Sequence, residues 1–104
     1  MNLLHQQYDL LITPQLATTA FAVNHEVPPS NGMMRWWEWS PFTYPFNLTQ
    51  QPAASVPCGF ASNGLPVAMQ FVGAKFDDKK VLRAARAYEQ VRPFAMPSLP
   101  PASA

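Results

Sequence analysis

Two short apolar stretches, residues 53–58 and 66–72, predict a pair of β-strands. In the second stretch both faces are mostly apolar, which is typical of a strand that is covered on two sides. Ser62, Asn63 and Gly64 lie between the stretches and predict the turn of a hairpin, because Asn and Gly tolerate a positive φ. Three prolines lack a donor for the sheet, and we expect them at strand ends, at an edge or at a bulge: Pro52, Pro57 and Pro66.

The clearest helical pattern follows the hairpin, over residues 76–91. Asp77 is a good N-cap, and Phe76 has the spacing to Val81 that a hydrophobic staple requires. One apolar stripe should face the sheet, with basic residues on a solvated outer face; the stripe consists of Val81, Leu82, Ala85 and Tyr88. Pro93 ends the helix, and residues 93–104 form a Pro-rich tail that we expect to be disordered or loosely draped.

The first half of the chain has a weaker pattern. Residues 10–12 are a continuous apolar run that ends at Thr13 and Pro14, which predicts a central strand buried on both faces. The predicted order is strand, aromatic loop, strand, strand, helix and tail, an α/β fold in which one helix covers a mixed sheet. Without further strands beside it, the first strand would expose apolar surface and an unpaired edge, which favours association.

The loop before the hairpin is rich in aromatic residues: Trp36, Trp37, Trp39, Phe42, Tyr44 and Phe46. Aromatic side chains bury a large area each, and they often line pockets or interfaces. The favoured interpretation is that they pack against the rest of the fold. The alternative is one wall of an apolar substrate pocket, to which Trp39, Phe42 and Phe46 would contribute.

Length and composition exclude several classes of protein. A chain of 104 residues allows one small domain, and a net charge of +1 gives no electrostatic footprint for nucleic acid or an anionic membrane. No apolar run approaches the roughly 20 residues that span a bilayer, and the N-terminus lacks the features of a signal peptide. We therefore expect a cytoplasmic protein with no cofactor.

Two candidates for chemistry have simpler explanations. His25 and Glu26 could begin a metal site, but no further ligands lie nearby, so solvated loop residues are favoured and no metal is expected. Cys58 is the only cysteine, which excludes an internal disulfide. It follows Val56 and Pro57 in a buried-looking strand, so a packed small residue is favoured over a nucleophile. A small enzyme built on Cys58 or His25 has almost no support.

Four runs of sequence carry a resemblance: YDLLITP (8–14), PFNLTQQPAASVPCGF (45–60), GLPVAMQFVG (64–73) and FDDKKVLRAARAYE (76–89). In this order they resemble the C-terminal part of the amidase signature family, serine hydrolases of amides that include the A subunits of tRNA-dependent amidotransferases. The resemblance implies that residues 1–92 are the C-terminal portion of an amidase-signature domain. Gln50 stands where the family usually has Gly, a residue that would permit a positive φ.

The resemblance also implies where catalysis takes place. The family uses a Ser nucleophile, a second Ser in a cis peptide and a Lys, all in a Gly/Ser-rich segment upstream of the matched part. This chain has no such segment, so no catalytic residue is assigned and we expect no amide hydrolysis by the chain alone. The expected partner is a complementing N-terminal amidase segment or a second copy of the chain, and a small amide would bind only in a complete enzyme.

Two further implications stay open. In the amidotransferase branch an acidic residue typically precedes the T-x-P-x-N string, whereas here the preceding residues are Trp39, Ser40, Pro41 and Phe42. That difference favours a parent enzyme that acts on less polar amides. The alternative to a hydrolase segment is a non-catalytic, oligomeric binding or assembly module derived from an amidase.

Overall fold

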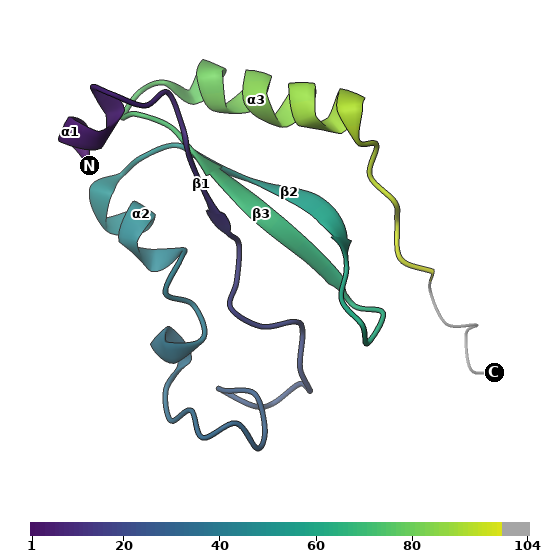
Figure 1. Cartoon of the computed structure of the whole chain (residues 1–104). Helices are drawn as coiled ribbons and strands as arrows, with labels where there is room; N and C mark the ends of the chain where they lie inside the picture. The colour runs from purple at the N-terminus through teal and green to yellow at the C-terminus, as the bar shows by residue number, and fades with distance from the viewer. Residues whose placement is uncertain (99–104) are drawn as a thin grey trace.

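The computed structural model describes residues 1–98, in which a three-stranded antiparallel sheet carries one long helix (Figure 1). The elements follow in the order α1 (Asn2–His5), β1 (Leu11–Pro14), the 3-10 helix η1 (Trp36–Glu38), α2 (Tyr44–Thr49), β2 (Ala53–Phe60), β3 (Pro66–Val72) and α3 (Asp78–Val91). The strand order is β1-β3-β2, so β3 lies in the centre. The predicted α/β class with a covering helix is confirmed, and both pairings among the described strands are antiparallel rather than mixed.

The hairpin of β2 and β3 forms where the sequence predicts it. Gly64 has a φ of 80° in the turn, a conformation that a residue without Cβ adopts at no steric cost. The prolines also lie where we expected them. Pro66 begins β3, Pro52 directly precedes β2, and Pro57 lies at a shift in register between Pro57 and Gly59. The strand positions therefore accommodate the missing N–H donors.

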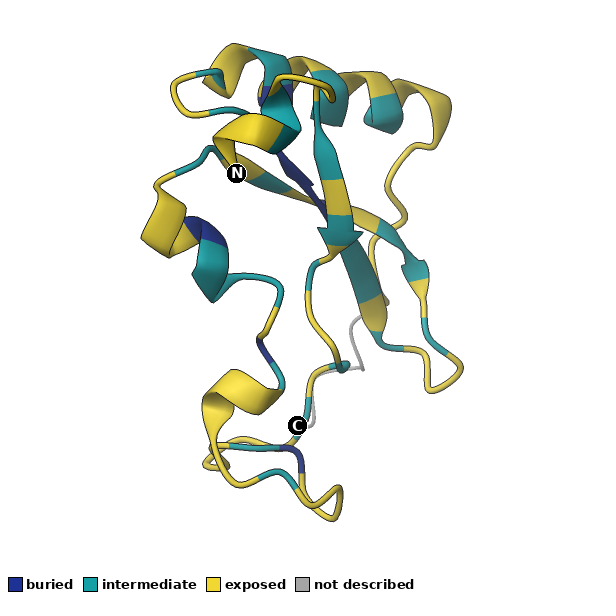
Figure 2. Ribbon diagram, turned by 60° about the vertical axis from the view of Figure 1, so that its left-hand side comes forward, coloured by how far each residue is buried: buried dark blue, intermediate teal, exposed yellow. Residues whose placement is uncertain are grey.

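The hydrophobic core lies between the sheet and α3. Val56 of β2, Phe71 of β3 and Val81 of α3 form its centre, with 2%, 5% and 2% of their surface exposed. The ring of Phe71 meets Tyr88 edge-to-face, with 6.1 Å between the ring centres. Figure 2 shows buried positions where α3 lies over the strands, and mostly exposed ones along the connection from β1 to α2. The core therefore depends mainly on three elements that are consecutive in the chain.

The apolar stripe of α3 differs from the prediction at one position. Leu82 is 67% exposed, and Ala84 packs against the core instead. The reason is geometric, because successive helical residues are rotated by about 100°. Ala84, Ala85 and Tyr88 lie three, four and seven residues after Val81 and share its face, whereas Leu82 is turned away from it.

The N-terminus of α3 also departs from the prediction. Asp77 is the N-cap residue, but its side chain makes no capping hydrogen bond, and its carboxylate pairs with Lys80 at 3.1 Å. The predicted hydrophobic staple is wrong. Phe76 has a φ of 69° and is 87% exposed, so the turn before the helix directs its ring into solvent and away from Val81.

The prediction that residues 10–12 form a central, doubly buried strand is wrong for this chain. Among the described residues β1 pairs with β3 alone, with Leu11 opposite Val72, so β1 forms one edge of the sheet. Ile12 is 59% exposed, because nothing in residues 1–98 covers its face or pairs with the outer edge. The expected exposure of apolar surface and an open edge is confirmed.

Two backbone positions let the elements join closely. Gly73, which directly follows β3, is buried, and a Cβ there would lie 2.6 Å from Cγ2 of Val81. The absence of a side chain at Gly73 therefore allows the first turn of α3 to rest on the end of β3. Gln50 is the C-cap of α2 and has the left-handed conformation, φ 56° and ψ 37°. The position thus keeps a conformation that favours glycine, and the Gln50 side chain accepts a hydrogen bond from Lys75 at 3.1 Å.

The segment after α3 was predicted to be a Pro-rich tail. Residues 93–98 have no regular secondary structure and are exposed. The rest of the predicted tail, residues 99–104, lies outside the described residues.

Candidate functional site

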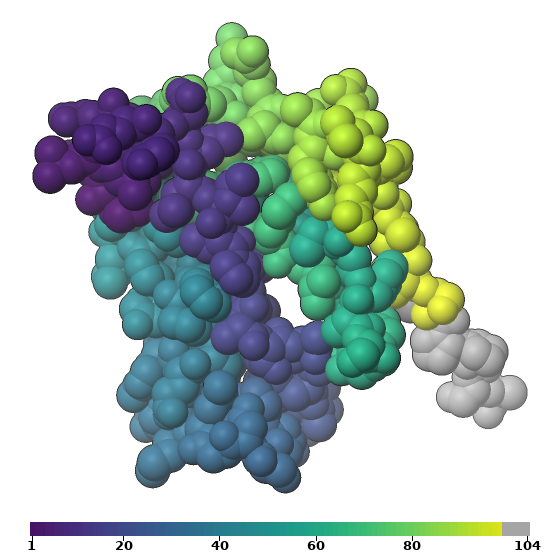
Figure 3. Space-filling model, in the orientation of Figure 1, coloured from purple at the N-terminus to yellow at the C-terminus, as the bar shows by residue number. Residues whose placement is uncertain are grey.

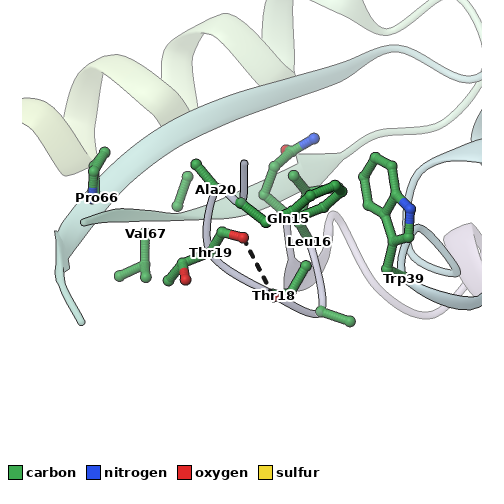
Figure 4. A pocket seen from close by; sticks show the side chains of 11 residues that line it. Gln15, Leu16, Thr18, Thr19, Ala20, Trp39, Pro66 and Val67 are labelled. Atoms are coloured by element: carbon green, nitrogen blue, oxygen red, sulfur yellow. Dashed lines mark hydrogen bonds between the residues drawn. The ribbon is translucent and has the colours of Figure 1, made fainter. Parts of the chain in front are cut away.

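A cavity of about 500 Å³ lies beside the N-terminal end of β3. Its walls come from the loop after β1, from the aromatic segment and from β3, through residues 15–21, Trp39 and residues 66–68 (Figure 4). Figure 3 shows a hollow between the loop that follows β1 and the β2–β3 hairpin. The site is therefore built where segments far apart in the sequence meet.

Trp39 is held in place by its own part of the chain. Its indole N–H donates to the backbone carbonyl of Glu26 at 2.8 Å, and Phe21 meets its ring edge-to-face with 5.4 Å between centres. The Glu26 carboxylate pairs with Arg35 at 3.0 Å and accepts the backbone N–H of Trp36 at 3.2 Å. The polar edge of Trp39 is satisfied, so the ring offers the cavity an apolar surface.

The loop after β1 is tied to the hairpin at two points. The backbone N–H of Gln15 donates to the carbonyl of Ala68 at 3.0 Å, which extends the pairing of β1 with β3. The amide of Asn63, in the hairpin turn, donates to the hydroxyl of Thr19 at 3.2 Å. These contacts hold the start of the lining loop segment, and a position two residues before its end, against the hairpin.

The structure separates the three aromatic residues that the sequence singled out. Trp39 lines the cavity, whereas Phe42 and Phe46 are not among its lining residues. Phe46 is 9% exposed in α2, and the half-buried Phe42 contributes its backbone carbonyl to a hydrogen bond with Gln70. The role of all three residues in a substrate pocket stays a prediction.

Two residues near the cavity were not found from the sequence. Phe21 lies in an aperiodic stretch that gave no signal. Gln70 is 4% exposed, and its amide donates to the hydroxyl of Thr13 at 3.0 Å and to the carbonyl of Phe42 at 2.8 Å. It joins β3 to β1 and to the aromatic segment. A single polar residue within an apolar strand was the available signal, because a buried amide needs partners of this kind.

The other residues that the sequence offered as candidates for chemistry are His25, Glu26 and Cys58. His25 is exposed, and Glu26 takes part in the ion pair with Arg35. The thiol of Cys58 is half-buried and donates to the carbonyl of Val67 at 3.6 Å. Residues 1–98 contain no group of three His, Cys, Asp or Glu side chains placed to hold a metal ion. Over the same range, no helix has the length and apolar character needed to cross a membrane.

The charge of the cavity limits what it can do. None of the described residues that line it is acidic, basic or a histidine, so the wall supplies no general acid or base. Lys80 lies away from the cavity, and hydrogen bonds to Asp77 and Asp9 raise its pKa. The described lining of the cavity is therefore uncharged and mostly apolar.

Comparison with known proteins gives consistent matches along most of the chain. The family model described as Amidase matches residues 1–82. The A subunit of the glutamyl-tRNA(Gln) amidotransferase of Brevibacillus brevis is 42% identical over 93 residues, which are 89% of this chain and 18% of that protein.

Two crystal structures show the same arrangement of elements. The corresponding amidotransferase protein from Thermotoga maritima superposes with a TM-score of 0.75 at 40% identity, over 91% of this chain and 20% of the other. A bacterial aryl acylamidase of the amidase signature family has a TM-score of 0.75 at 30% identity, over 90% of this chain and 20% of its own. The chain thus spans about a fifth of the length of the relatives that it matches.

Proposed function

The chain belongs to the amidase family, and from this premise we propose that it is the C-terminal segment of an enzyme that hydrolyses amide C–N bonds. The observation that carries the proposal is the family match over residues 1–82, in a chain that spans 18% to 20% of its relatives. The proposal assigns the reaction to the complete protein. This segment supplies three strands, the covering helix and a wall of the substrate pocket. In this proposal Trp39 belongs to the lining of the cavity, whereas Phe42 and Phe46 contribute to the wall from outside that lining.

The proposal places the Ser, Ser and Lys of catalysis outside this segment. The serines of the chain lie apart from one another rather than in a Gly/Ser-rich cluster, and its lysines are Lys75, Lys79 and Lys80, at the start of α3. The neutral wall of the cavity supports this division, because it offers a binding surface without an acid or a base. We therefore expect activity only when the remaining part of an amidase fold is present.

The two edges of the sheet differ in their capacity to accept that part. Within residues 1–98 nothing pairs with the outer edge of β1. Ile12 of β1 is exposed, and so is Leu82, which lies in a groove between α3 and the residues just before β1. The edge formed by β2 is less suited to pairing, because Pro57 has no N–H and the register shifts between it and Gly59. The complementing segment should therefore add its strand at β1.

Complementation in solution tests the proposal. An amidase segment that carries the catalytic residues should gain amide hydrolysis when this chain is added. The substitution Ile12→Glu places a charge on the open edge and should abolish the gain, whereas Val23→Glu, at a position that is 82% exposed in a loop, should leave it intact. Both positions are exposed, so neither change should unfold the chain.

The outcomes separate the two candidate functions. Activity no higher than that of the catalytic segment alone would refute the proposal. If the chain instead formed a defined oligomer in light scattering and did not bind that segment, a non-catalytic assembly module would replace it.

A further inference from the structure

We propose that the groove between α3 and the residues just before β1 is the docking site of a second helix, which is amphipathic and carries acidic residues along one flank. The inference rests on the proposed function, because in the complete enzyme this helix would belong to the complementing amidase segment. The chain spans about a fifth of the length of its relatives, so that segment is long enough to supply such a helix.

The layer of helices over the sheet is incomplete. α3 packs mainly on β2 and β3. Ile12 of β1 lies opposite Phe71 of β3, and opposite residues of an antiparallel pair project from the same face, so Ile12 shares the face that carries α3. A helix is about 10 Å wide and neighbouring strands are about 4.8 Å apart, so one helix covers about two strands. β1 and a strand added at its open edge therefore leave room for one more helix beside α3.

The groove has the length and the floor that a helix requires. It has a volume of about 680 Å³ and follows α3 from Lys79 to Gln90, which is about 16 Å or three turns of helix. The lining nearest β1 includes Leu10, Ala84 and Ala87. The small alanine side chains allow a neighbouring helix axis to approach to about 8 Å, the short end of the usual range. A helix of about three turns can therefore rest its apolar stripe on these residues.

The outer rim of the groove is basic. Lys79 and Arg83 lie one turn apart on α3, are exposed and make no ion pair within residues 1–98. Lys80 and Arg86 also line the groove, but each is already paired with a carboxylate. Acidic side chains one turn apart on the docked helix would meet the two unpaired cations, whereas basic side chains would be repelled by them. The charge of the rim therefore selects an acidic flank.

Binding of matched helical peptides to the full chain tests the inference. Each probe is a hydrocarbon-stapled helix of about 15 residues, because an unconstrained helix of that length is marginal in water. Both probes have the same stripe of Leu and Ala; beside it one carries two Glu, one turn apart, and the other carries two Lys. We expect the acidic peptide to shift the backbone ¹H–¹⁵N NMR signals of Ala84 and Ala87 in a saturable way. The basic peptide should bind at least about tenfold more weakly.

A pair of charge reversals tests the location of the site. Arg83 is exposed, so the fold should tolerate Arg83→Glu, which cancels the charge of Lys79 on the rim and should bring the ratio of the two affinities to about one. Arg92→Glu is the matched control, since Arg92 is exposed at the end of α3 and lies outside the lining. It is about 13 Å along the helix from Arg83, beyond the Debye length of about 8 Å at physiological salt, and should leave the ratio unchanged.

The complementation assay tests whether the docked helix belongs to the amidase segment. Arg83→Glu should raise the concentration of chain that gives half of the maximal gain in hydrolysis by about tenfold, and Arg92→Glu should not raise it. A gain that Arg83→Glu leaves unaffected would overturn the inference while the proposed function stands.

The peptide results separate the inference from the proposed function. Equal affinities for the two peptides, or no saturable shift at Ala84 and Ala87, would overturn the inference whatever the enzyme does. A chain that forms a dimer lost in Arg83→Glu would also overturn it, because a second copy would then occupy the groove. Selective binding of the acidic peptide without any gain of hydrolysis on complementation would refute the proposed function alone.

Discussion

The junction between β3 and α3 predicts a specific pattern of stability when Gly73 acquires a side chain. In Gly73→Ala the new Cβ would lie 2.6 Å from Cγ2 of Val81, too close for two carbon atoms that do not move apart. The next contacts are ordinary, with the carbonyl of Asp77 at 3.5 Å and Cγ of Pro52 at 3.6 Å. The conflict therefore involves mainly one methyl group, and the opposing side chain can be changed to remove it.

The magnitudes follow from this geometry. Overpacking of a core costs about 1–3 kcal/mol, and we expect Gly73→Ala to lower the free energy of unfolding by about 2 kcal/mol. Val81 is 2% exposed, and Val81→Ala deletes two methyl-sized groups at ~0.8 kcal/mol each and leaves a small cavity, so its cost is also about 2 kcal/mol. In the double variant the close contact is absent and the new Cβ fills part of the space. Its cost should be about 2–3 kcal/mol instead of the ~4 kcal/mol expected for independent sites.

Urea unfolding followed by far-UV circular dichroism measures this coupling. The four proteins of the cycle are the parent, the two single variants and the double variant, and the slope m should be the same in all of them. A coupling of about 1–2 kcal/mol in favour of the double variant supports the close approach of Gly73 and Val81. Additive effects, or a Gly73→Ala variant as stable as the parent, would show that the end of β3 and the first turn of α3 are not packed as described.

Two further perturbations test single positions. Gln50→Gly should raise the free energy of unfolding by about 1 kcal/mol, because the left-handed conformation costs a residue with a Cβ about 1–2 kcal/mol. The control Gln50→Ala keeps that cost, so it should bring no gain in the same urea titration. Hydrogen bonds to Asp77 and Asp9 raise the pKa of Lys80 above its ordinary value of 10.5. The charged form of Lys80 therefore stabilises the folded state fully below pH 10.5, and this stabilisation is lost as the pH rises through the folded-state pKa. The urea midpoint of the parent should therefore fall above pH 10.5 more steeply than that of Lys80→Met, and equal slopes would contradict the assignment.

The hairpin could be predicted because its signals are local. Gly64 marks the turn, and the prolines mark the ends and the bulge of the strands, so short-range chemistry alone locates the two strands and the turn of this unit. The core face of α3 could be predicted except at Leu82, because a helical stripe is defined only to within about one residue without knowledge of what it covers. The predicted hydrophobic staple at Phe76 was wrong for a similar reason, because the positive φ of Phe76 depends on how α3 joins β3.

The position of β1 and most of the cavity depend on tertiary contacts. An apolar run such as residues 10–12 indicates the environment of a strand, but the sequence does not reveal which neighbours are present to bury it. Trp39 could be identified as a candidate because aromatic residues are dense around it. Phe21 could not, because its role arises only where the loop folds back to meet Trp39 at 5.4 Å.

The separation of the core from the cavity has a consequence for how such a protein can diversify. Val56, Phe71 and Val81 come from one contiguous part of the chain, whereas most of the cavity wall comes from the long connection between β1 and β2. Loop closure is a weak function of length, with roughly 0.6 kcal/mol for each doubling, so that connection can lengthen, shorten or exchange its aromatic residues at little thermodynamic cost. Selection can therefore explore new ligands in the connection while the residues that hold the fold together stay unchanged.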